Sequence, residues 1–221
     1  KKDNHMGWTI QVHSLVGNDK WLSHASQPNN PAHNCVGGIK TALRRLIFIP
    51  SNRIRILSTS GQILPDNMKT MKISASIGKV YFMTLDENGY PDAIPNKWII
   101  NMKNNMQIIV DFTKKETKTV QDVMGLKNII SKKYGIPRNK INLYDNEQKY
   151  LNDDIQLAYL ENRELVNKLT MRITGFNDKQ RLIFVHFAKG SDINVTKCVT
   201  VDSKDKLSGI VYKIGLEMKD D

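Results

Sequence analysis

A spaced pattern of apolar residues that ends in Ile-Pro occurs twice in this chain. Residues 36–50 read Val-x-x-Ile-x-x-x-Leu-x-x-x-x-Phe-Ile-Pro, and residues 123–137 read Val-x-x-Leu-x-x-x-Ile-x-x-x-x-Gly-Ile-Pro, with each matched position 87 residues further on. An apolar stripe at helical spacing followed by proline is one supersecondary unit, and a fixed period indicates an array. The first half of the pattern recurs at Leu207, Ile210 and Ile214. The chain is therefore expected to hold two copies of one module and the start of a third.

The repeat predicts the domain organisation. Turn-rich segments separate the copies: residues 86–96 contain Asn, Asp, Gly and Pro, and residues 174–180 contain Gly, Asn and Asp. A hairpin with one helix is only half a core, so the parent protein is expected to continue. The expected parts are module one at 8–86, a linker at 87–96, module two at 97–174, a linker at 175–180 and half of module three at 181–221.

Module one is expected to place a single helix between two groups of strands. Ile10 and Val12 alternate with polar residues, which is typical of a half-buried strand. The apolar stripe then forms one face of a helix, which ends before Pro50 because proline disfavours helix at the preceding residue. The expected strands are 9–16, 20–25, 54–56, 62–64 and 80–85, and the expected helix is 35–47.

Module two repeats this order, with an ambiguity at its start. One interpretation takes 98–102 and 106–112 as the first hairpin, and it is favoured because both strands have ordinary length. The other takes 106–112 and 116–120. A capping signal at Thr119 and Asp122 precedes the next helix. The remaining expected elements are a helix at 121–134, strands at 141–143, 149–151 and 168–173, and in module three strands at 182–187 and 194–201 with a helix from 205.

This order of elements resembles the ubiquitin-like, or β-grasp, family. The resemblance is carried by Leu126-Lys127, by Gly135-Ile136-Pro137 and by residues 140–151, with residues 53–66 as the matching stretch of copy one. It implies an α+β protein made of tandem β-grasp modules, each with a mixed sheet packed on one helix. A mixed sheet leaves an apolar face, and the helix stripe covers it.

The ends of the copies depart from ubiquitin. Ubiquitin is conjugated through a C-terminal Leu-Arg-Gly-Gly tail, whereas residues 83–87 read Met-Thr-Leu-Asp-Glu and residues 171–176 read Met-Arg-Ile-Thr-Gly-Phe. Neither end offers the di-glycine that activating enzymes and processing proteases need. We therefore expect copies that are neither cleaved apart nor conjugated.

The resemblance also implies where partners dock. Ubiquitin is recognised through an exposed apolar patch on its sheet. Copy one places Leu57 at the centre of that patch, so we expect an exposed leucine there, and the matching positions in copy two are more polar. The candidate protein-interaction residues are Leu57, Arg53, Arg55, Tyr144, Thr170 and Arg172.

Catalytic and metal-binding patterns are missing from the sequence. Cys35 and Cys198 lie in different copies, and no His-Asp arrangement accompanies either of them. The histidines fit no metal-ligand spacing, and no glycine-rich phosphate loop is present. The sequence therefore predicts a protein that is not an enzyme and holds no cofactor or metal.

The net charge is +11 and the pI about 9.6, which bears on partners more than on fold. Acidic protein surfaces such as tubulin or other subunits of a large complex would suit this charge. Nucleic acid would also suit it, although no motif supports that partner. No apolar run approaches membrane-spanning length, so no membrane association is predicted. A cytoplasmic location, in a cytoskeletal or ciliary assembly, follows as an expectation.

Three functions remain open at this point. The first is a structural or scaffold subunit built of tandem ubiquitin-like modules. The second is an adaptor of the ubiquitin system that docks on ubiquitin or proteasome receptors. The third is a polyubiquitin-like precursor that is processed to conjugable units.

Overall fold

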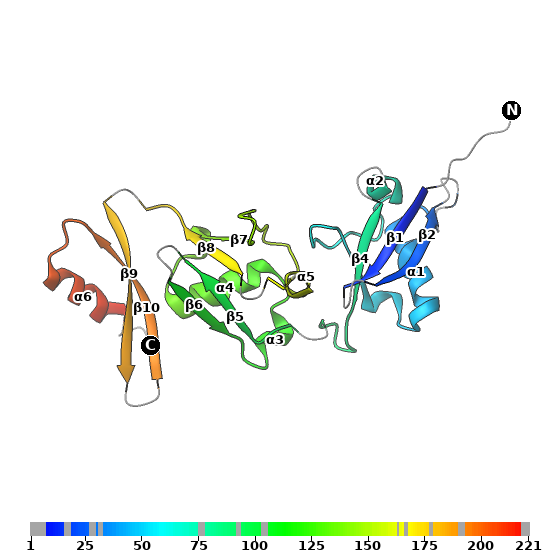
Figure 1. Ribbon diagram of the computed structural model, residues 1–221. Coiled ribbons are helices and arrows are strands. Elements are labelled where there is room, and N and C mark those ends of the chain that lie inside the picture. The colour runs from blue at the N-terminus through cyan, green and yellow to red at the C-terminus, as the bar shows by residue number, and fades with distance from the viewer. Residues whose placement is uncertain are drawn as a thin grey trace. The chain divides into compact units, whose positions relative to one another are not determined.

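The structure is a computed structural model, and it places α-helices and β-sheets in one mixed α+β chain (Figure 1). Its described residues form two sheets of four strands and one of two. The described residues are 8–15, 19–26, 30, 33–74, 78–91, 94–102, 106–162, 164–165, 168–176, 179–189 and 193–217.

The chain divides into two compact units that do not follow the chain order. The first comprises Lys1–Trp98, Asp111–Val123 and Asn152–Asn167. The second comprises Ile99–Val110, Met124–Leu151 and Lys168–Asp221. A short segment near residue 155 thus belongs to the same unit as residues 8–91.

The first sheet is mixed, with its two central strands parallel. Its strands are β1 (Trp8–Ser14), β2 (Lys20–Ser26), β3 (Ile54–Leu57) and β4 (Lys79–Thr84), in the order β2-β1-β4-β3. Strand β1 pairs antiparallel with β2 and parallel with β4, and β3 pairs antiparallel with β4. A parallel pair needs a crossover connection, and the chain between β1 and β4 supplies it with a helix.

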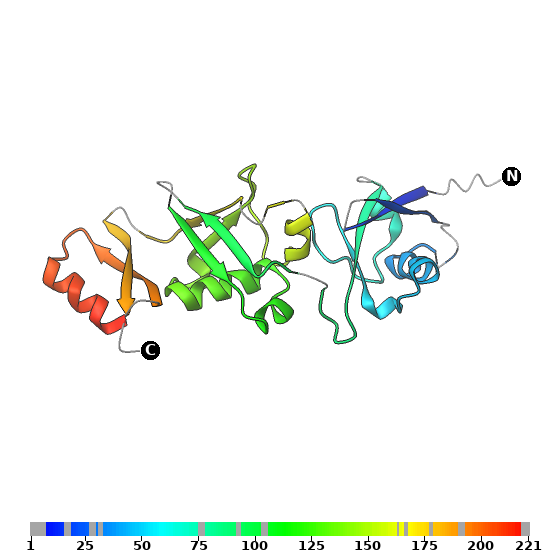
Figure 2. The same cartoon turned by 60° about the horizontal axis from the view of Figure 1, so that its bottom comes forward.

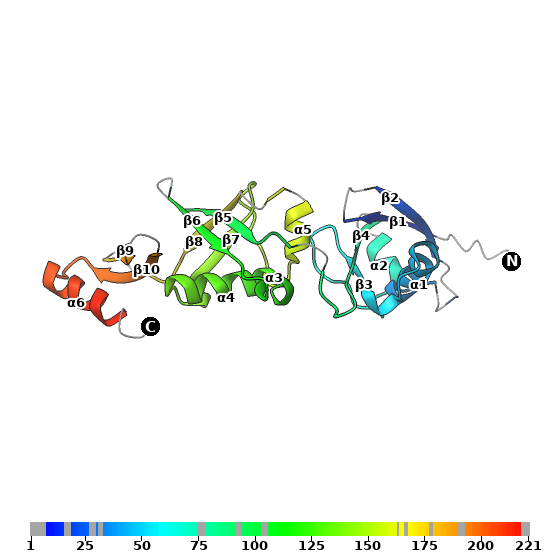
Figure 3. The same ribbon diagram turned by 90° about the horizontal axis from the view of Figure 1, so that it is seen from below.

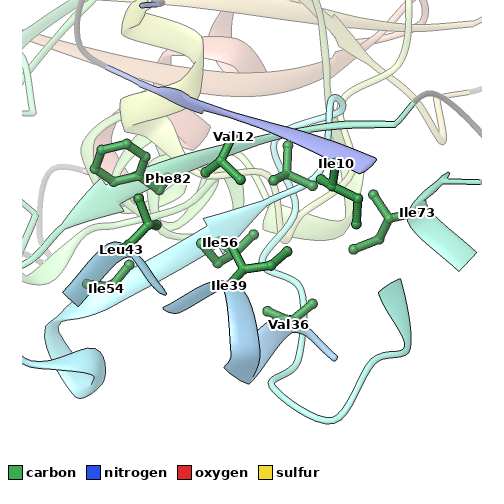
Figure 4. Packing of buried hydrophobic residues seen from close by; sticks show 10 residues of the cluster. Ile10, Val12, Val36, Ile39, Leu43, Ile54, Ile56, Ile73 and Phe82 are labelled. Carbon is green, nitrogen blue, oxygen red and sulfur yellow. The ribbon is translucent and has the colours of Figure 1, made fainter. Parts of the chain in front are cut away.

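Helix α1 (Val36–Ile47) covers one face of this sheet. Its residues Val36, Ile39 and Leu43 lie three or four apart and are fully buried. They pack with residues from β1, β3 and β4 in one cluster (Figure 4). Burying each aliphatic side chain of this kind contributes about 1.5–3 kcal/mol, so the stripe is what fixes the helix on the sheet. The remaining buried members are Ile10, Val12, Ile54, Ile56, Ile73, Val80 and Phe82.

The second four-stranded sheet has the same strand order. Its strands are β5 (Lys97–Asn101), β6 (Gln107–Asp111), β7 (Ile141–Tyr144) and β8 (Leu169–Ile173), in the order β6-β5-β8-β7. Strand β5 is parallel to β8, and β7 is antiparallel to β8. Helix α4 (Val123–Tyr134) lies beside it (Figure 2), and the Tyr134 hydroxyl donates to the Ile109 carbonyl at 2.7 Å.

The 87-residue period holds in the backbone hydrogen bonds. Val36 N–H donates to Met68 at 3.0 Å, and Val123 N–H donates to Ile155 at 3.0 Å. Thr70 N–H donates to the Asn34 carbonyl at 2.9 Å. Leu157, 87 positions later, donates its N–H to the Gln121 carbonyl, also at 2.9 Å. Two pairs of short helices also begin 87 residues apart. They are the single-turn 3-10 helices Ser51–Arg53 and Arg138–Lys140, and the short helices α2 (Thr70–Ser74) and α5 (Leu157–Asn162). Both stretches therefore fold in one way.

The C-terminal elements form a hairpin and a helix. Strands β9 (Gln180–Lys189) and β10 (Ile193–Asp202) pair antiparallel, and α6 (Leu207–Glu217) runs beside β10 (Figure 3). The Lys213 ammonium bonds to the Asp205 carboxylate at 2.5 Å, and this bond lowers the pKa of Asp205. None of the described helices has the length and apolar character needed to cross a bilayer.

Most predicted elements are confirmed, and several details are corrected. The favoured hairpin of β5 and β6 forms, whereas residues 116–120 hold helix α3 (Glu116–Thr119) and not a strand. The Thr119 hydroxyl bonds to Lys115 within α3, so it does not cap α4. The short strands expected at 62–64 and 149–151 contain only isolated bridges, and helices α2 and α5 were not predicted. The sequence also predicts turns at 17–19, 104–105 and 189–192 between the paired strands, and of these, residues 17–18, 104–105 and 190–192 fall outside the described residues.

Candidate interaction surfaces

The structure overturns the expected exposure of Leu57. Strand β3 points Ile54 and Ile56 at α1, so Leu57 faces the other side of the sheet. Its side chain is nevertheless 0% exposed. The predicted patch centre is therefore a core residue, and the reason lies in what covers that side of the sheet.

Tyr159 lies over this part of the sheet within the first compact unit. Leu57 pairs across strands with Tyr81, and the Tyr81 ring meets the Tyr159 ring edge-on at 6.0 Å. The Tyr159 hydroxyl donates to the Thr59 carbonyl at 2.5 Å. A buried tyrosine of this kind gives both apolar area and a directed polar bond. Tyr159 is itself buried, so its ring forms part of the cover.

Main-chain bonds hold the segment that carries Tyr159. The Gln156 N–H donates to the Gly61 carbonyl at 3.0 Å, and Gln62 forms an antiparallel bridge with Ile155. The Gln62 side-chain amide also donates to the Asp154 carboxylate at 2.8 Å. We call residues 59–62 with residues 154–159 the clasp. It joins segments about 95 residues apart in the sequence.

Gly61 permits the clasp for two reasons. First, its φ of +84° is a backbone conformation that residues with a side chain rarely adopt. Second, a Cβ at this position would lie 2.4 Å from the Tyr159 ring. The counterpart 87 positions later is Gln148, which has φ +62°. Both turns close with the same bonds, Gly61 N–H to Ser58 and Gln148 N–H to Asp145, each at 3.1 Å. The turns are alike in backbone, but only the first leaves room for a ring.

Arg53 and Arg55, the other predicted residues of copy one, bond to their own surroundings. The Arg53 guanidinium donates to the Leu85 carbonyl at 2.8 Å. The Arg55 guanidinium reaches the Asn52 carbonyl at 3.4 Å. Both side chains are half-buried. Arg53 thereby ties the end of β4 to the start of β3.

The structure brings the three predicted residues of copy two together. Tyr144 on β7 pairs with Thr170 on β8, and the Arg172 guanidinium lies 4.5 Å from the centre of the Tyr144 ring. The Tyr144 ring meets Tyr150 edge-on at 5.8 Å, and the Lys127 ammonium lies 5.3 Å from the centre of the Tyr150 ring. Cations over aromatic faces are attracted by the ring quadrupole. This surface of the second unit is thus a row of two adjacent rings, Tyr144 and Tyr150, with a cation over each of them.

Two lysines on helices are buried, Lys40 on α1 and Lys127 on α4. Lysine side chains are rarely buried unless they are paired. The Lys40 ammonium forms a salt bridge with Asp66, whose side chain is largely exposed. A buried ammonium needs such a partner, since an unpaired buried charge is strongly unfavourable. These lysines therefore have a structural part and are not open to an acidic partner.

Sequence reasoning missed the residues that build the clasp and the ring row. Tyr159 and Tyr150 were not predicted as site residues, and the sequence indicated only a turn at Gly61. Comparing the two copies at the 87-residue offset would have pointed to Gly61, because Gln148 stands in its place. Tyr159 gave no such signal, since its burial depends on a segment far away in the sequence.

The described residues show no other chemistry that would define a site. They contain no group of three or more His, Cys, Asp or Glu side chains placed to hold a metal ion. The two cysteines are free thiols, with Cys198 buried and Cys35 half-buried. No protein-family model matches the sequence, and comparison with curated proteins finds no match. The fold and these surfaces are therefore the features that bear on function.

Proposed function

We propose that this chain is a non-enzymatic tandem ubiquitin-like protein that acts as a structural or scaffold subunit of a larger assembly. Two observations support the β-grasp assignment. Both four-stranded sheets have parallel central strands and the same order, and their hydrogen bonds recur at 87 positions. In each copy the helix begins after the first hairpin and is followed by a 3-10 turn and the third strand.

The clasp is the observation that carries the scaffold proposal. It closes the sheet face on which ubiquitin-like modules of an adaptor would receive partners. It does so with a main-chain bond from Gln156 to Gly61 and with the buried Tyr159. Backbone pairing of this kind fixes residues 154–159 against residues 59–62 in one arrangement. A fixed arrangement suits a structural subunit of an assembly.

The adaptor function is less well supported. Docking on ubiquitin receptors would require an accessible apolar patch, and Leu57 at the centre of the expected patch is buried. Opening that patch would break the bonds of the clasp. The cation and ring row around Tyr144 is exposed in part, but its chemistry favours polar and acidic partners over an apolar one.

The precursor function meets a different obstacle. Processing needs a flexible end after the last strand, whereas Leu85 after β4 is buried and its N–H donates to Arg53 at 2.8 Å. Asp86 then accepts bonds from the N–H groups of Asn88 and Tyr90, at 2.9 Å each. The chain is thus held in an ordered turn where a protease would need an extended strand.

The proposed partners are proteins with acidic surfaces, such as tubulin or neighbouring subunits of a large complex. The net charge of +11 and the exposed Arg172 support this. Nucleic acid is a second anionic partner, with no motif in its favour. A cytoplasmic, cytoskeletal or ciliary location belongs to the same proposal.

Cross-linking mass spectrometry on the native protein, after size fractionation of cell extract, tests the scaffold proposal. We expect the protein in a large particle, with reproducible lysine cross-links to a few neighbours. Migration as a small species, or cross-links mainly to proteasomal or ubiquitin-conjugating proteins, would replace the scaffold with the adaptor.

A titration distinguishes the two functions directly. A purified ubiquitin-binding domain is added to the isotope-labelled chain, and amide shifts around Leu57 are followed by NMR. We expect no shifts in the wild type because the clasp covers this face. The Tyr159→Ala variant serves as the matched control in which the face is opened. Saturable shifts in the wild type would contradict the scaffold assignment.

A further inference from the structure

Phe48 ends helix α1 with a backbone conformation that is unfavourable for any residue with a side chain. Its φ is +56° and ψ +23°, the left-handed region that glycine usually occupies at a helix end. Its N–H donates to the Arg44 carbonyl at 3.0 Å, which closes the helix. The counterpart in copy two is Gly135, with φ +70° and the same bond, to Ser131 at 2.9 Å. The fold therefore needs only a glycine here.

The Phe48 side chain is not buried by the fold, so packing does not offset this strain. It is 88% exposed, and Leu46 two residues earlier is 49% exposed. Copy two has glycine and Lys133 at these two places. Strained backbone at a non-glycine residue is a mark of functional sites, and an exposed phenylalanine beside a leucine is a mark of a binding surface.

Two arginines border these apolar side chains. Arg44 and Arg45 occupy the last turn of α1 and are exposed. Neither guanidinium bonds to any residue that the structure describes. Guanidinium groups bind carboxylates through two parallel bonds, so free arginines around an aromatic anchor define a partner with acidic groups around an apolar pocket.

We propose that Arg44, Arg45, Leu46 and Phe48 form a docking knob for a protein partner whose apolar pocket is bordered by carboxylates. Phe48 enters the pocket, and the arginines pair with its acidic border. A pocket requires an anchor that is held in one direction, and the bond of the Phe48 N–H to Arg44 holds this helix end. Insertion into a lipid surface requires no fixed direction of the ring. This site goes beyond the scaffold proposal, which does not use α1.

The internal repeat supplies the test variant. Phe48→Gly copies Gly135, so it removes the ring and the strain together. We expect the melting temperature to rise by roughly 2–5 °C, because glycine adopts this conformation freely. Lost binding in this variant then cannot be explained by unfolding.

A photo-reactive residue at Thr41, exposed one turn before Arg45, reports docking in native extract. We expect one saturable protein adduct whose cross-linked peptide is rich in carboxylates. It is lost in Phe48→Gly and in the double variant R44E/R45E, and it is kept in Met71→Ala, which removes an exposed side chain elsewhere. The adduct protein, once purified, should bind Phe48→Gly roughly 30-fold more weakly than wild type.

Three results would overturn the proposal. The first is an adduct of equal yield in Phe48→Gly and wild type. The second is a cross-linked peptide without acidic residues. The third is binding of the wild type to phosphatidylserine vesicles that depends on Phe48, which would assign the knob to a membrane surface. The scaffold proposal is tested through Tyr159, so the two can fail separately.

Discussion

The ring of Tyr159 fills the space that a side chain on Gly61 would need. An added Cβ would lie 2.4 Å from the Tyr159 Cδ1 and 2.6 Å from its Cγ. These atoms belong to a buried ring held by the bond of its hydroxyl to Thr59, so the ring cannot simply turn aside. The presence of glycine at this turn and the closed sheet face are thus one feature of the molecule.

Gly61→Ala should therefore destabilise the first unit by about 3 kcal/mol, from backbone strain and from the clash with the ring. Gly89→Ala is the matched control, since Gly89 has φ +82° with nothing within 4 Å of an added Cβ. Denaturant unfolding should show a loss of only about 1 kcal/mol for the control. Equal losses in both variants would mean that the ring does not press on Gly61.

Tyr159→Phe keeps the ring and removes one hydrogen bond. We expect a loss of about 1 kcal/mol in the free energy of unfolding, as for a typical buried hydroxyl. Amide exchange at Gln156 should become faster, because that N–H is bonded to Gly61 in the same clasp. Unchanged exchange would show that the hydroxyl bond does not hold the segment.

Leu57 should behave as a core residue. Leu57→Ala is expected to lower the free energy of unfolding by about 3 kcal/mol, from lost burial and the cavity left behind. Its counterpart Tyr144 is only half-buried, so Tyr144→Ala should cost about 1–2 kcal/mol. A larger loss of stability in Tyr144→Ala than in Leu57→Ala, measured by thermal or denaturant unfolding, would show that Leu57 is a surface residue.

The buried Lys40 should respond differently to the loss of its charge and the loss of its partner. Asp66→Asn leaves a buried ammonium without its carboxylate and should cost about 2–3 kcal/mol. Lys40→Met removes the charge itself and should change stability by less than about 1 kcal/mol. Similar large losses in both variants would show that the ion pair contributes more than it costs to desolvate.

The Asp86 turn should loosen in acid. The N–H of Tyr90, followed by that of Asn88, lowers the pKa of Asp86 below its ordinary value. A lowered pKa in the folded state gives stability that is present at neutral pH and is lost as pH falls below about 4. NMR should show the Tyr90 amide exchanging faster below that pH, and Asp86→Asn should flatten this dependence. An equal pH dependence in the variant would assign it to another carboxyl.

The longer helices and most of the strands followed from local pattern. The stripe at Val36, Ile39 and Leu43 with Pro50 behind it predicts α1 to within one residue, because periodicity and proline act within a few positions. Short helices α2 and α5 were missed, since neither has enough turns to show a period. The strand order of the two four-stranded sheets was not predicted, because it depends on pairing between segments that lie far apart in the sequence.

The sequence by itself determined the repeat and the position of each helix stripe, because equal spacing in two stretches produces equal local structure. Only the tertiary structure decided that Leu57 is buried and that Tyr159 covers its side of the sheet. Whether a side chain meets water depends on segments that arrive from far along the chain, and Thr59 and Tyr159 are 100 residues apart. Sequence and structure both contribute to the inference about Phe48. The repeat shows that copy two has glycine in its place, and the structure shows its strained backbone and exposed side chain.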